Sequence, residues 1–414
     1  MRRICMTKNN IPAGYKDSAV GIIPLEWEVK KVKSICNIDA NSLSSKTSPD
    51  YEFDYISLSD VDNDSFEVIK SHQLFKTAPS RARRIVKRND VVISTVRPNL
   101  QGFFMIKNDV EDLIVSTGFS VLSPIKCNPY YLLVYFFSEA ITKQFYSLVV
   151  GSNYPAVNSS DVANLKIACP TLIEQQKIVE ILRTWDEAIE KQSKLIKALE
   201  KRKKALIQLL LTGRVRLPGY TKKWKRIKIE NVANEYSVRN YKQLNLIVLS
   251  CTKYNGLVSS LNYFGKQIYS NDLSSYKIVP KKHFAYATNH IDEGSIGYQN
   301  DYDKALISPM YTVFKTNSII INDDYLYMLM KTDYMIYKYK SLMEGSIDRR
   351  GGLHWKSFAS IEIKLPPIEE QEAIANIMVS ADNEIKHHQA KLNQLRKQKQ
   401  GLMQQLLTGK KRVK

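Results

Sequence analysis

The feature that most constrains the fold is a segment that the chain of 414 residues contains twice. The segment that begins at Pro170 aligns without a gap with the segment that begins at Pro366, at an offset of 196 positions. Each copy places a proline ahead of an acidic turn and ends in Leu-Leu-Thr-Gly, at 210–213 and at 406–409. A match of this length indicates an internal repeat, so the chain is expected to build one architecture twice.

Each copy is predicted to form one long helix. Apolar residues recur at alternating steps of four and three, which is the spacing of a coiled-coil seam, and a glycine follows the last of them. Each helix should have about 40 residues and be roughly 60 Å long at 1.5 Å per residue. The predicted apolar seam positions are Ile178, Leu182, Trp185, Ile189, Ile196, Leu199, Leu206, Ile374, Met378, Ile385, Leu392, Leu395 and Leu402.

The repeat extends beyond the helices, because a domain-sized stretch precedes each of them. Short echoes connect the two stretches, such as "DVVISTVR" (90–97) with "HFAYATNH" (283–290). The ends of a domain usually lie close together, so the end of the first helix should lie beside the start of the second, and the helices should be antiparallel.

The predicted fold class is therefore α+β, with two globular mixed α/β domains separated by two long helices that form an antiparallel coiled coil with approximate twofold symmetry. The expected segments are a first domain at 1–169, a first helix at 170–213, a second domain at 214–365, and a second helix with a basic tail at 366–414.

Composition favours a soluble cytoplasmic protein. Hydrophobic residues make up 44% and charged residues 25% of the chain, and the longest apolar run is too short to span a bilayer. The five cysteines are scattered, with neither a CxxC pair nor histidines at zinc-finger spacing. This pattern indicates a reducing compartment and argues against a disulfide framework or structural zinc.

The net charge points to a polyanionic partner. Lys and Arg number 61 against 41 acidic residues, which gives +20, and nucleic acid is the commonest polyanion in the cytoplasm. Charge that serves only solubility is the alternative. Two related domains on an antiparallel rod would suit a duplex, since its strands are also antiparallel and each domain could read its own short sequence.

These features together resemble one known family, the specificity subunits of type I restriction–modification systems. The strongest marks are the P-x-x-x-E-Q-x-x-I helix starts at 170–178 and 366–374, followed by the twin LLTG ends. A Gly-Tyr and a Trp also precede each domain, in "GYKDSAVGIIPLEWEVKKV" (14–32) and "LPGYTKKWKRIKI" (217–229), although the second spacing is shorter. The resemblance covers essentially the whole chain.

The resemblance implies a protein that recognises DNA and is not an enzyme by itself. Each target-recognition domain would read one half of a bipartite site in double-stranded DNA. The helices would set the spacer and dock two methyltransferase subunits, with endonuclease/translocase subunits joining that core. The chain would thereby direct the adenine-N6 methylation and the cleavage carried out by its partners.

Catalytic motifs are weak in this chain. "NPYY" at 128–131 resembles the N/D-P-P-Y/F motif of amino-methyltransferases, but the second proline is missing and no glycine-rich cofactor loop precedes it. A helix start is the better interpretation. No phosphate-binding GxxxxGK[ST] occurs, and the adjacent His387 and His388 would point about 100° apart on a helix. The chain is expected to have no catalytic residue, cofactor or metal.

In the first domain, DNA contacts are predicted from a basic run and from two loops. Phosphate contacts should come from Lys and Arg, and base contacts from Arg, Asn, Gln, Ser and Thr on loops. The basic run lies just before a strand-like "DVVISTV", a loop constrained by Pro98 and Gly102 follows that strand, and the third stretch is "GSNYP". The predicted residues are Arg81, Arg83, Arg84, Lys87, Arg88, Arg97, Asn99, Asn153 and Tyr154. A solvated basic face is the alternative for the run.

In the second domain, the loop aligned with that of Arg97 and Asn99 offers Asn289 and His290. "GSIDRRGG" (345–352) adds Arg349 and Arg350, next to glycines that allow the backbone to approach a phosphate. These four residues complete the predicted DNA-binding set.

Two other functions remain open at this point. A structural coiled-coil adaptor that joins two protein-binding domains would show no affinity for a duplex. A stand-alone methyltransferase would bind a cofactor. A DNA reader would instead lose affinity steeply as salt is added, because binding to phosphates releases counterions.

Overall fold

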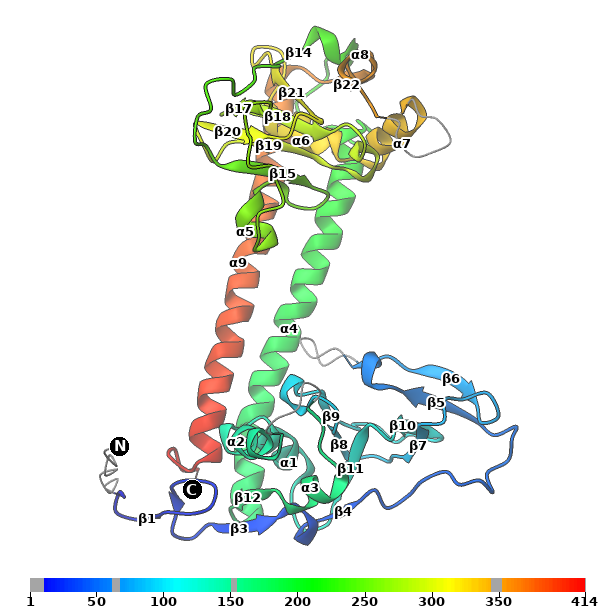
Figure 1. The fold of residues 1–414 in the computed structure, drawn as a ribbon, viewed down its shortest axis with the longest axis vertical. Helices are drawn as coiled ribbons and strands as arrows, with labels where there is room; N and C mark the ends of the chain where they lie inside the picture. Colours follow the sequence, from blue (N-terminus) through cyan, green and yellow to red (C-terminus); the bar gives the residue numbers. More distant parts are fainter. Residues whose placement is uncertain (1–10, 62–67, 150–154, 344–351, 414) are drawn as a thin grey trace. The chain divides into compact units, whose positions relative to one another are not determined.

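The computed structural model describes residues 11–61, 68–149, 155–343 and 352–413 (Figure 1). The chain forms two compact units, Met1–Ser193 with Lys391–Lys414, and Lys194–Ala390. Each unit contains one globular domain and one half of each long helix. In the part of the chain that the structure describes, no helix is both long and apolar enough to cross a membrane.

The first unit contains two four-stranded sheets, with strand orders β4-β11-β8-β9 and β6-β5-β10-β7, and two strand pairs, β1-β2 and β12-β3. Neighbouring strands are antiparallel except for β5 and β10, which are parallel. The strands are β1 (Tyr15–Lys16), β2 (Ile23–Pro24), β3 (Glu28–Lys31), β4 (Cys36–Ile38), β5 (Glu52–Ile56), β6 (Ser71–Leu74), β7 (Ala82–Ile85), β8 (Val91–Ser94), β9 (Phe103–Met105), β10 (Leu113–Ser116), β11 (Phe119–Pro124) and β12 (Lys166–Cys169). The helices of this domain are α1 (Pro129–Phe136), α2 (Glu139–Leu148) and α3 (Ser159–Asn164), with short 3₁₀ turns η1 (Val32–Ser34), η2 (Leu58–Asp60) and η3 (Pro98–Leu100).

Among the described residues, the second unit repeats the two four-stranded sheets and the pair β12-β3, but not the pair β1-β2. Its sheets have the orders β14-β21-β18-β19 and β16-β15-β20-β17, with the pair β13-β22, and its one parallel pairing joins β15 to β20. The strands are β13 (Lys225–Lys228), β14 (Ala233–Glu235), β15 (Val248–Thr252), β16 (Gly256–Ser259), β17 (Lys277–Pro280), β18 (His283–Ala287), β19 (Ile296–Gln299), β20 (Lys304–Ile307), β21 (Tyr311–Thr316) and β22 (Glu362–Leu365). The helices are α5 (Ser260–Phe264), α6 (Asp323–Met330), α7 (Asp333–Leu342) and α8 (Trp355–Ala359), with 3₁₀ turns η4 (Ile229–Asn231) and η5 (Ile291–Glu293). The repeat therefore includes the globular domains, where the sequence echoes are short.

The similar segments "DVVISTVR" and "HFAYATNH" contain β8 and β18, which are equivalent strands of the two units. β8 and β18 are buried along their whole length, as expected for uninterrupted apolar runs that are covered on both faces. The helix predicted at "NPYY" is also present, because the Asn128 side chain accepts hydrogen bonds from the backbone of Tyr130 and Tyr131 at the start of α1. Asn322 caps α6 in the same way by accepting from the Tyr325 backbone.

The two long helices, α4 (Leu172–Leu211) and α9 (Ile368–Leu407), have 40 residues each, as predicted. In the first unit, the start of α4 lies beside the end of α9, since Glu174 pairs with Arg412 at 2.8 Å and Asp186 pairs with Lys399 at 2.5 Å. Moving forward along α4 therefore means moving backward along α9. The helix segments in this unit are antiparallel.

The second unit has the reciprocal pairing. Glu370 near the start of α9 pairs with Arg216 just beyond α4, and Asp382 pairs with Lys203. The predicted antiparallel coiled coil is thus present in each unit. Seven of the predicted seam residues are buried and the other six are half-buried. The buried seam residues are Ile178, Leu182, Ile196, Leu199, Ile374, Met378 and Ile385.

The distribution of charge along α4 and α9 favours their antiparallel pairing. Residues 172–191 contain five acidic and three basic residues, whereas 192–211 contain one acidic and six basic residues. The second helix has five acidic residues and one basic residue in 368–387, and four basic residues with no acid in 388–407. An antiparallel pair sets the acidic half of one helix against the basic half of the other, and each charge also complements the helix dipole at its own end.

In the first unit, the acidic residue of the E-Q motif holds a buried clamp. Glu174 accepts hydrogen bonds from Trp27 Nε1 at 3.0 Å and from Arg412 Nε at 2.8 Å. The Arg412 guanidinium lies over the Trp27 ring, 5.9 Å from its centroid. The Glu174 carboxylate therefore joins the start of α4 to Trp27, which lies between β2 and β3, and to Arg412, which lies beyond α9.

The second unit has an equivalent clamp with the repeats exchanged. Glu370 is fully buried and accepts from Trp224 Nε1 at 3.1 Å and from Arg216 Nε and Nη2 at 2.6 and 2.7 Å. Such two-pronged Arg–carboxylate pairing is among the strongest side-chain interactions. Each glutamate is thus bound by an arginine from beyond the other repeat's helix.

The glutamine of the motif fastens each helix to its domain. Gln175 donates to the Pro170 carbonyl and accepts from the Asn128 backbone, both at 2.9 Å. Gln371 makes the same two bonds with Pro366 and Asn322, also at 2.9 Å. The E-Q pair therefore has a structural explanation, since one side chain clamps the helix pair and the other fixes the domain.

Replacing Glu370 by Ala is expected to lower the free energy of unfolding by about 2 to 4 kcal/mol, because a partly buried arginine and a tryptophan N–H would lose their acceptor. Urea denaturation followed by circular dichroism would measure the loss. The matched control is Glu372→Ala, an exposed acid on the same helix, which should change stability by less than about 0.5 kcal/mol. Equal stabilities of the two variants would contradict the clamp.

Candidate nucleic-acid interface

In the first unit, the loop after β8 lies against a segment from a distant part of the sequence. The Val157 backbone donates to the Thr95 carbonyl at 2.9 Å, and the Arg97 backbone donates to the Pro155 carbonyl at 2.7 Å. The predicted residues Asn153 and Tyr154 lie outside the described residues, but the segment that directly follows them is held beside the loop of Arg97 and Asn99. Pro155, the described end of the "GSNYP" stretch, therefore contacts the loop of Arg97 and Asn99.

The second unit has the same arrangement at the corresponding loop. The Leu353 backbone donates to the Thr288 carbonyl at 2.8 Å, next to the predicted Asn289 and His290. Arg349 and Arg350 lie outside the described residues, just before this contact. Each domain thus presents a loop from the end of its central strand together with the segment that leads into a short helix, α3 or α8.

The loop of the first unit is held in a strained conformation. Arg97 and Gln101 both have left-handed backbones, with φ of 50° and 53°, which costs about 1 to 2 kcal/mol for each non-glycine residue. Pro98 between them is buried and packs beside a hollow of about 220 Å³ with aromatic walls that include Phe103 and Phe145. Packing and backbone bonds therefore fix the loop, and Arg97 and Asn99 are exposed on it.

The basic run of the first domain is divided between interior and surface. Arg84 pairs with Asp39 at 2.7 Å, and the two side chains are only 20% and 10% exposed. The other oxygen of that carboxylate accepts from the Val121 backbone at 2.7 Å. Arg84 therefore neutralises a partly buried acid.

The other basic residues of the run are nearer to solvent. Arg83 is half-buried, with its guanidinium 4.8 Å from the centre of the Phe75 ring, and Arg88 forms an exposed ion pair with Asp109. Arg81 and Lys87 are exposed, and neither forms an ion pair with any residue that the structure describes. The strand β7 runs through this cluster, so its residues alternate between the two faces of the sheet.

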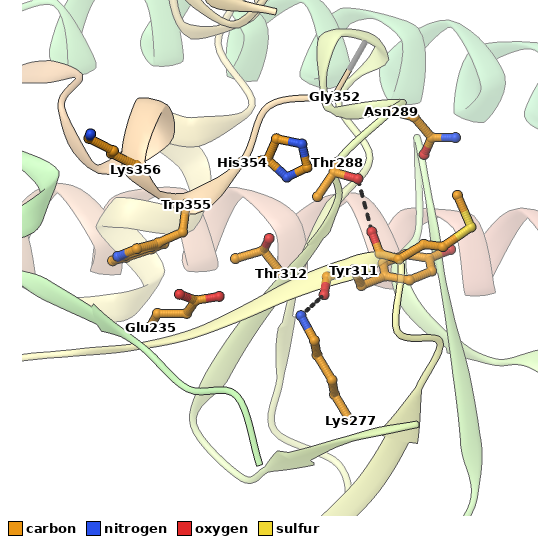
Figure 2. Close-up of a pocket in the computed structure, with 11 residues that line it drawn as sticks. Glu235, Lys277, Thr288, Asn289, Tyr311, Thr312, Gly352, His354, Trp355 and Lys356 are labelled. Carbon is orange, nitrogen blue, oxygen red and sulfur yellow. Dashed lines mark hydrogen bonds between the residues drawn. The ribbon is translucent and has the colours of Figure 1, made fainter. Parts of the chain in front are cut away.

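The second unit carries a polar cavity of about 750 Å³ beside its loop (Figure 2). Thr288 Oγ1 donates to the Met310 carbonyl at 2.9 Å, and Lys277 Nζ donates to the Tyr311 carbonyl at 2.7 Å. Asn289 lines this cavity, whereas His290 is exposed and lies 3.5 Å from the Glu293 carboxylate. The cavity is lined by Glu235, Lys277, Thr288, Asn289, Met310, Tyr311, Thr312, Gly352, His354, Trp355 and Lys356.

Burial lowers the pKa of the cavity lysine, Lys277. Lys277 is 9% exposed, and desolvation lowers its pKa from the usual value, a shift that the negative charge of Glu235 partly opposes. Since its ammonium group is already bonded to a backbone carbonyl, the lysine supports the cavity wall. The charged groups that remain available are those of Glu235 and Lys356, which are exposed.

Sequence reasoning missed Glu235, His354 and Lys356. Glu235 lies on β14, and the other two lie more than a hundred residues later around the start of α8, so no local pattern connects them. The one available signal was that "GSIDRRGG" leads directly into this segment.

Comparison with known proteins identifies the architecture. The sequence profile described as "Type I restriction modification DNA specificity domain" matches twice, over residues 24–201 and 222–397. These matches cover more than half of the chain. The chain belongs to the type I restriction–modification DNA specificity family.

Full-length relatives of this type I specificity protein are distant in sequence. A type I restriction enzyme specificity subunit of Methanocaldococcus jannaschii, MjaX, is 26% identical over 97% of both chains. The HindI specificity subunit of Haemophilus influenzae is 27% identical over 159 residues, which are 37% of this chain and 34% of that protein.

Solved structures share the fold of the specificity protein. The HsdS subunit from Thermoanaerobacter tengcongensis is 20% identical with a TM-score of 0.51, over 94% of this chain and 98% of that one. The type I S subunit from M. genitalium is 14% identical with a TM-score of 0.52, over 92% and 96% of the two chains. At these identities the likeness shows the fold alone.

Two arginines of the basic run should behave differently when each is replaced by Ala. Arg84→Ala is expected to cost about 2 to 3 kcal/mol of stability, because it leaves Asp39 without its partner. Arg81→Ala should change stability by less than about 0.5 kcal/mol. If Arg81 contacts a phosphate, its loss should also reduce the slope of log affinity against log salt by about 0.9. Thermal melting and duplex titrations at several salt concentrations would test both, and a stable Arg84→Ala variant would refute the structural assignment.

Proposed function

We propose that this chain is the DNA-recognition subunit of a type I restriction–modification complex and catalyses no reaction by itself. Each of its two DNA specificity domains reads one half of a bipartite target in double-stranded DNA. One observation carries this proposal. In both domains, the loop at the end of a central strand is hydrogen-bonded to the segment before a short helix, and the two loops carry different side chains. The loop that carries Arg97 and Asn99 in one domain corresponds to the loop that carries Asn289 and His290 in the other.

Side-chain chemistry supports a different role for each group of residues. Arginine and asparagine can bond two acceptor or donor positions of a base edge at once, so residues on a fixed loop can discriminate bases. Exposed cations such as Arg81 and Lys87 carry no sequence information but hold phosphates. Base or phosphate contacts are also proposed for Arg349 and Arg350, and for Asn153 and Tyr154, from the sequence alone.

The partner enzymes supply the chemistry in this proposal. The helices dock two methyltransferase subunits, and endonuclease/translocase subunits join through them, so that adenine-N6 methylation and cleavage take place at the site that this chain selects. Support comes from the relatives, which are named as specificity subunits of type I restriction enzymes. A coiled-coil adaptor with two protein-binding domains is not favoured, because both domains match a DNA specificity profile.

The two halves of the target should respond to separate substitutions. In the complex assembled with its methyltransferase subunits, Arg97→Ala should relax one half of the methylated motif and Asn289→Ala the other. Each lost base contact should reduce discrimination by about 1 to 3 kcal/mol. Sequencing of methylated adenines in a randomised DNA library would measure the motif.

The matched controls for that experiment are Arg226→Ala and Asn300→Ala, which alter exposed residues away from both loops. Both should leave the motif unchanged. A wild-type complex that methylates without any bipartite motif would refute the proposed function.

The spacer role predicts a second effect. The boundary between the units falls after Ser193 in α4 and after Ala390 in α9, so a heptad inserted at both places leaves the ion pairs within each unit intact. Seven residues lengthen a helix by about 10 Å. The tolerated gap between half-sites should therefore grow by about one to three base pairs. The same methylation mapping measures the gap.

The control for the paired insertion is a heptad placed in α4 alone, which should shift the pairs of one unit out of register and reduce stability. An unchanged gap in the stable double-insertion variant would show that the helices do not set the spacer.

A further inference from the structure

The second domain carries an acid at the place where a basic surface would be expected. Glu235 is the last residue of β14, an edge strand of its sheet, and it is exposed. Figure 2 shows its carboxylate among the side chains that line the cavity, together with Asn289 and Trp355. It therefore lies in the same hollow as a residue of the proposed recognition loop.

Glu235 is not neutralised by a direct partner within the ranges that the structure describes. No ion pair or side-chain hydrogen bond joins it to another of these residues. Its charge acts on Lys277, but the ammonium of that lysine donates at 2.7 Å to the Tyr311 carbonyl and is buried. The carboxylate thus keeps its accepting oxygens available.

The first domain treats its acid differently. In the corresponding strand β4, Ile38 pairs with β11 at the position where Glu235 pairs with β21. The acid of the first domain comes one residue later: Asp39 is paired with Arg84 at 2.7 Å and is 10% exposed. The first domain therefore has an apolar residue at the position of Glu235, and the neighbouring acid Asp39 is neutralised, whereas Glu235 faces a cavity. This difference separates Glu235 from an ordinary support residue.

A lone carboxylate beside DNA is unfavourable unless it receives a hydrogen bond, because the phosphates repel it. A carboxylate can only accept. In the major groove, the amino groups of adenine N6 and cytosine N4 donate, whereas guanine O6 and N7 and thymine O4 accept. An exposed carboxylate at a base edge would therefore select bases that present an exocyclic amino group and reject the others.

We infer that Glu235 is a specificity-determining residue of the second domain, and that its carboxylate accepts a hydrogen bond from the exocyclic amino group of an adenine or a cytosine in one half of the target. This inference rests on the proposed function and adds a base class to it. Asn289 and His354 line the same cavity and offer both donors and acceptors to neighbouring positions of the base edge. The cavity is wide enough to admit a base edge with ordered water, which commonly bridges protein and base.

The test uses the complex of this chain with its methyltransferase subunits and compares wild type with Glu235→Gln. Glutamine keeps the shape of the side chain, removes the charge and can donate as well as accept. At one position of one half-site, discrimination against guanine and thymine should fall about tenfold or more. The other half-site should be unchanged. Methylated adenines in a randomised DNA library give both values in one measurement.

The matched control is Glu362→Gln, which removes an equal charge from an exposed position on β22 that does not line the cavity. It should leave the motif as in wild type, so that a general charge effect is separated from base selection. Thermal melting of both variants should match that of the wild-type chain.

The outcomes distinguish a failure of the role of Glu235 from a failure of the proposed function. A Glu235→Gln complex that methylates the wild-type motif, or relaxes only the half-site read by the first domain, overturns the role of Glu235 while the DNA-recognition function stands. A wild-type complex without a bipartite motif overturns both.

Discussion

The structure depends on a carboxylate at the start of each long helix whose arginine partner comes from the other repeat. Glu174 and Arg216 belong to the same repeat, but they flank opposite ends of a 40-residue helix and cannot meet. Glu174 is instead bound by Arg412, and Glu370 by Arg216. Each repeat therefore completes the other, and the internal duplication accounts for both the matched helix ends and the antiparallel direction.

The polarity of charge along the helices makes this exchange specific. A parallel pair would set acidic halves against each other and basic halves against each other, which is unfavourable along the whole contact. The clamps then add hydrogen bonds and ring contacts at a defined register. Gln175 and Gln371 each join the start of a long helix to its globular domain. The long helices therefore also hold in position the domain that carries each recognition loop.

The parts of this architecture that the sequence predicted are those governed by local periodicity. Helix length, seam positions and the helix start at "NPYY" follow from spacing and from residues close in sequence. The role of Arg84 did not follow, because its partner Asp39 lies 45 positions away, just beyond strand β4, and a basic run looks the same whether or not one of its members is paired. Glu235 was missed for the same reason, since strand topology alone brings it to the loop of Asn289. Residues of a binding surface are collected by tertiary structure, so their identities can be predicted only where they cluster in sequence.

The ion pairs of the folded chain also bear on why it should bind a polyanion. Arginines and lysines at the clamps, along the helices and beside Asp39 serve the fold, which could suggest that the basic composition is structural. Ion pairs, however, cancel one negative charge for each positive charge. Even if all 41 acidic residues were paired internally, a net charge of +20 from the 61 basic residues would remain. Internal ion pairs therefore determine where the excess positive charge lies but cannot remove it. An anionic partner stabilises a surface with that excess charge. An acid left exposed in a recognition cavity, as Glu235 is, weakens that attraction locally. Such an acid is expected only where its carboxylate accepts a hydrogen bond from a particular base.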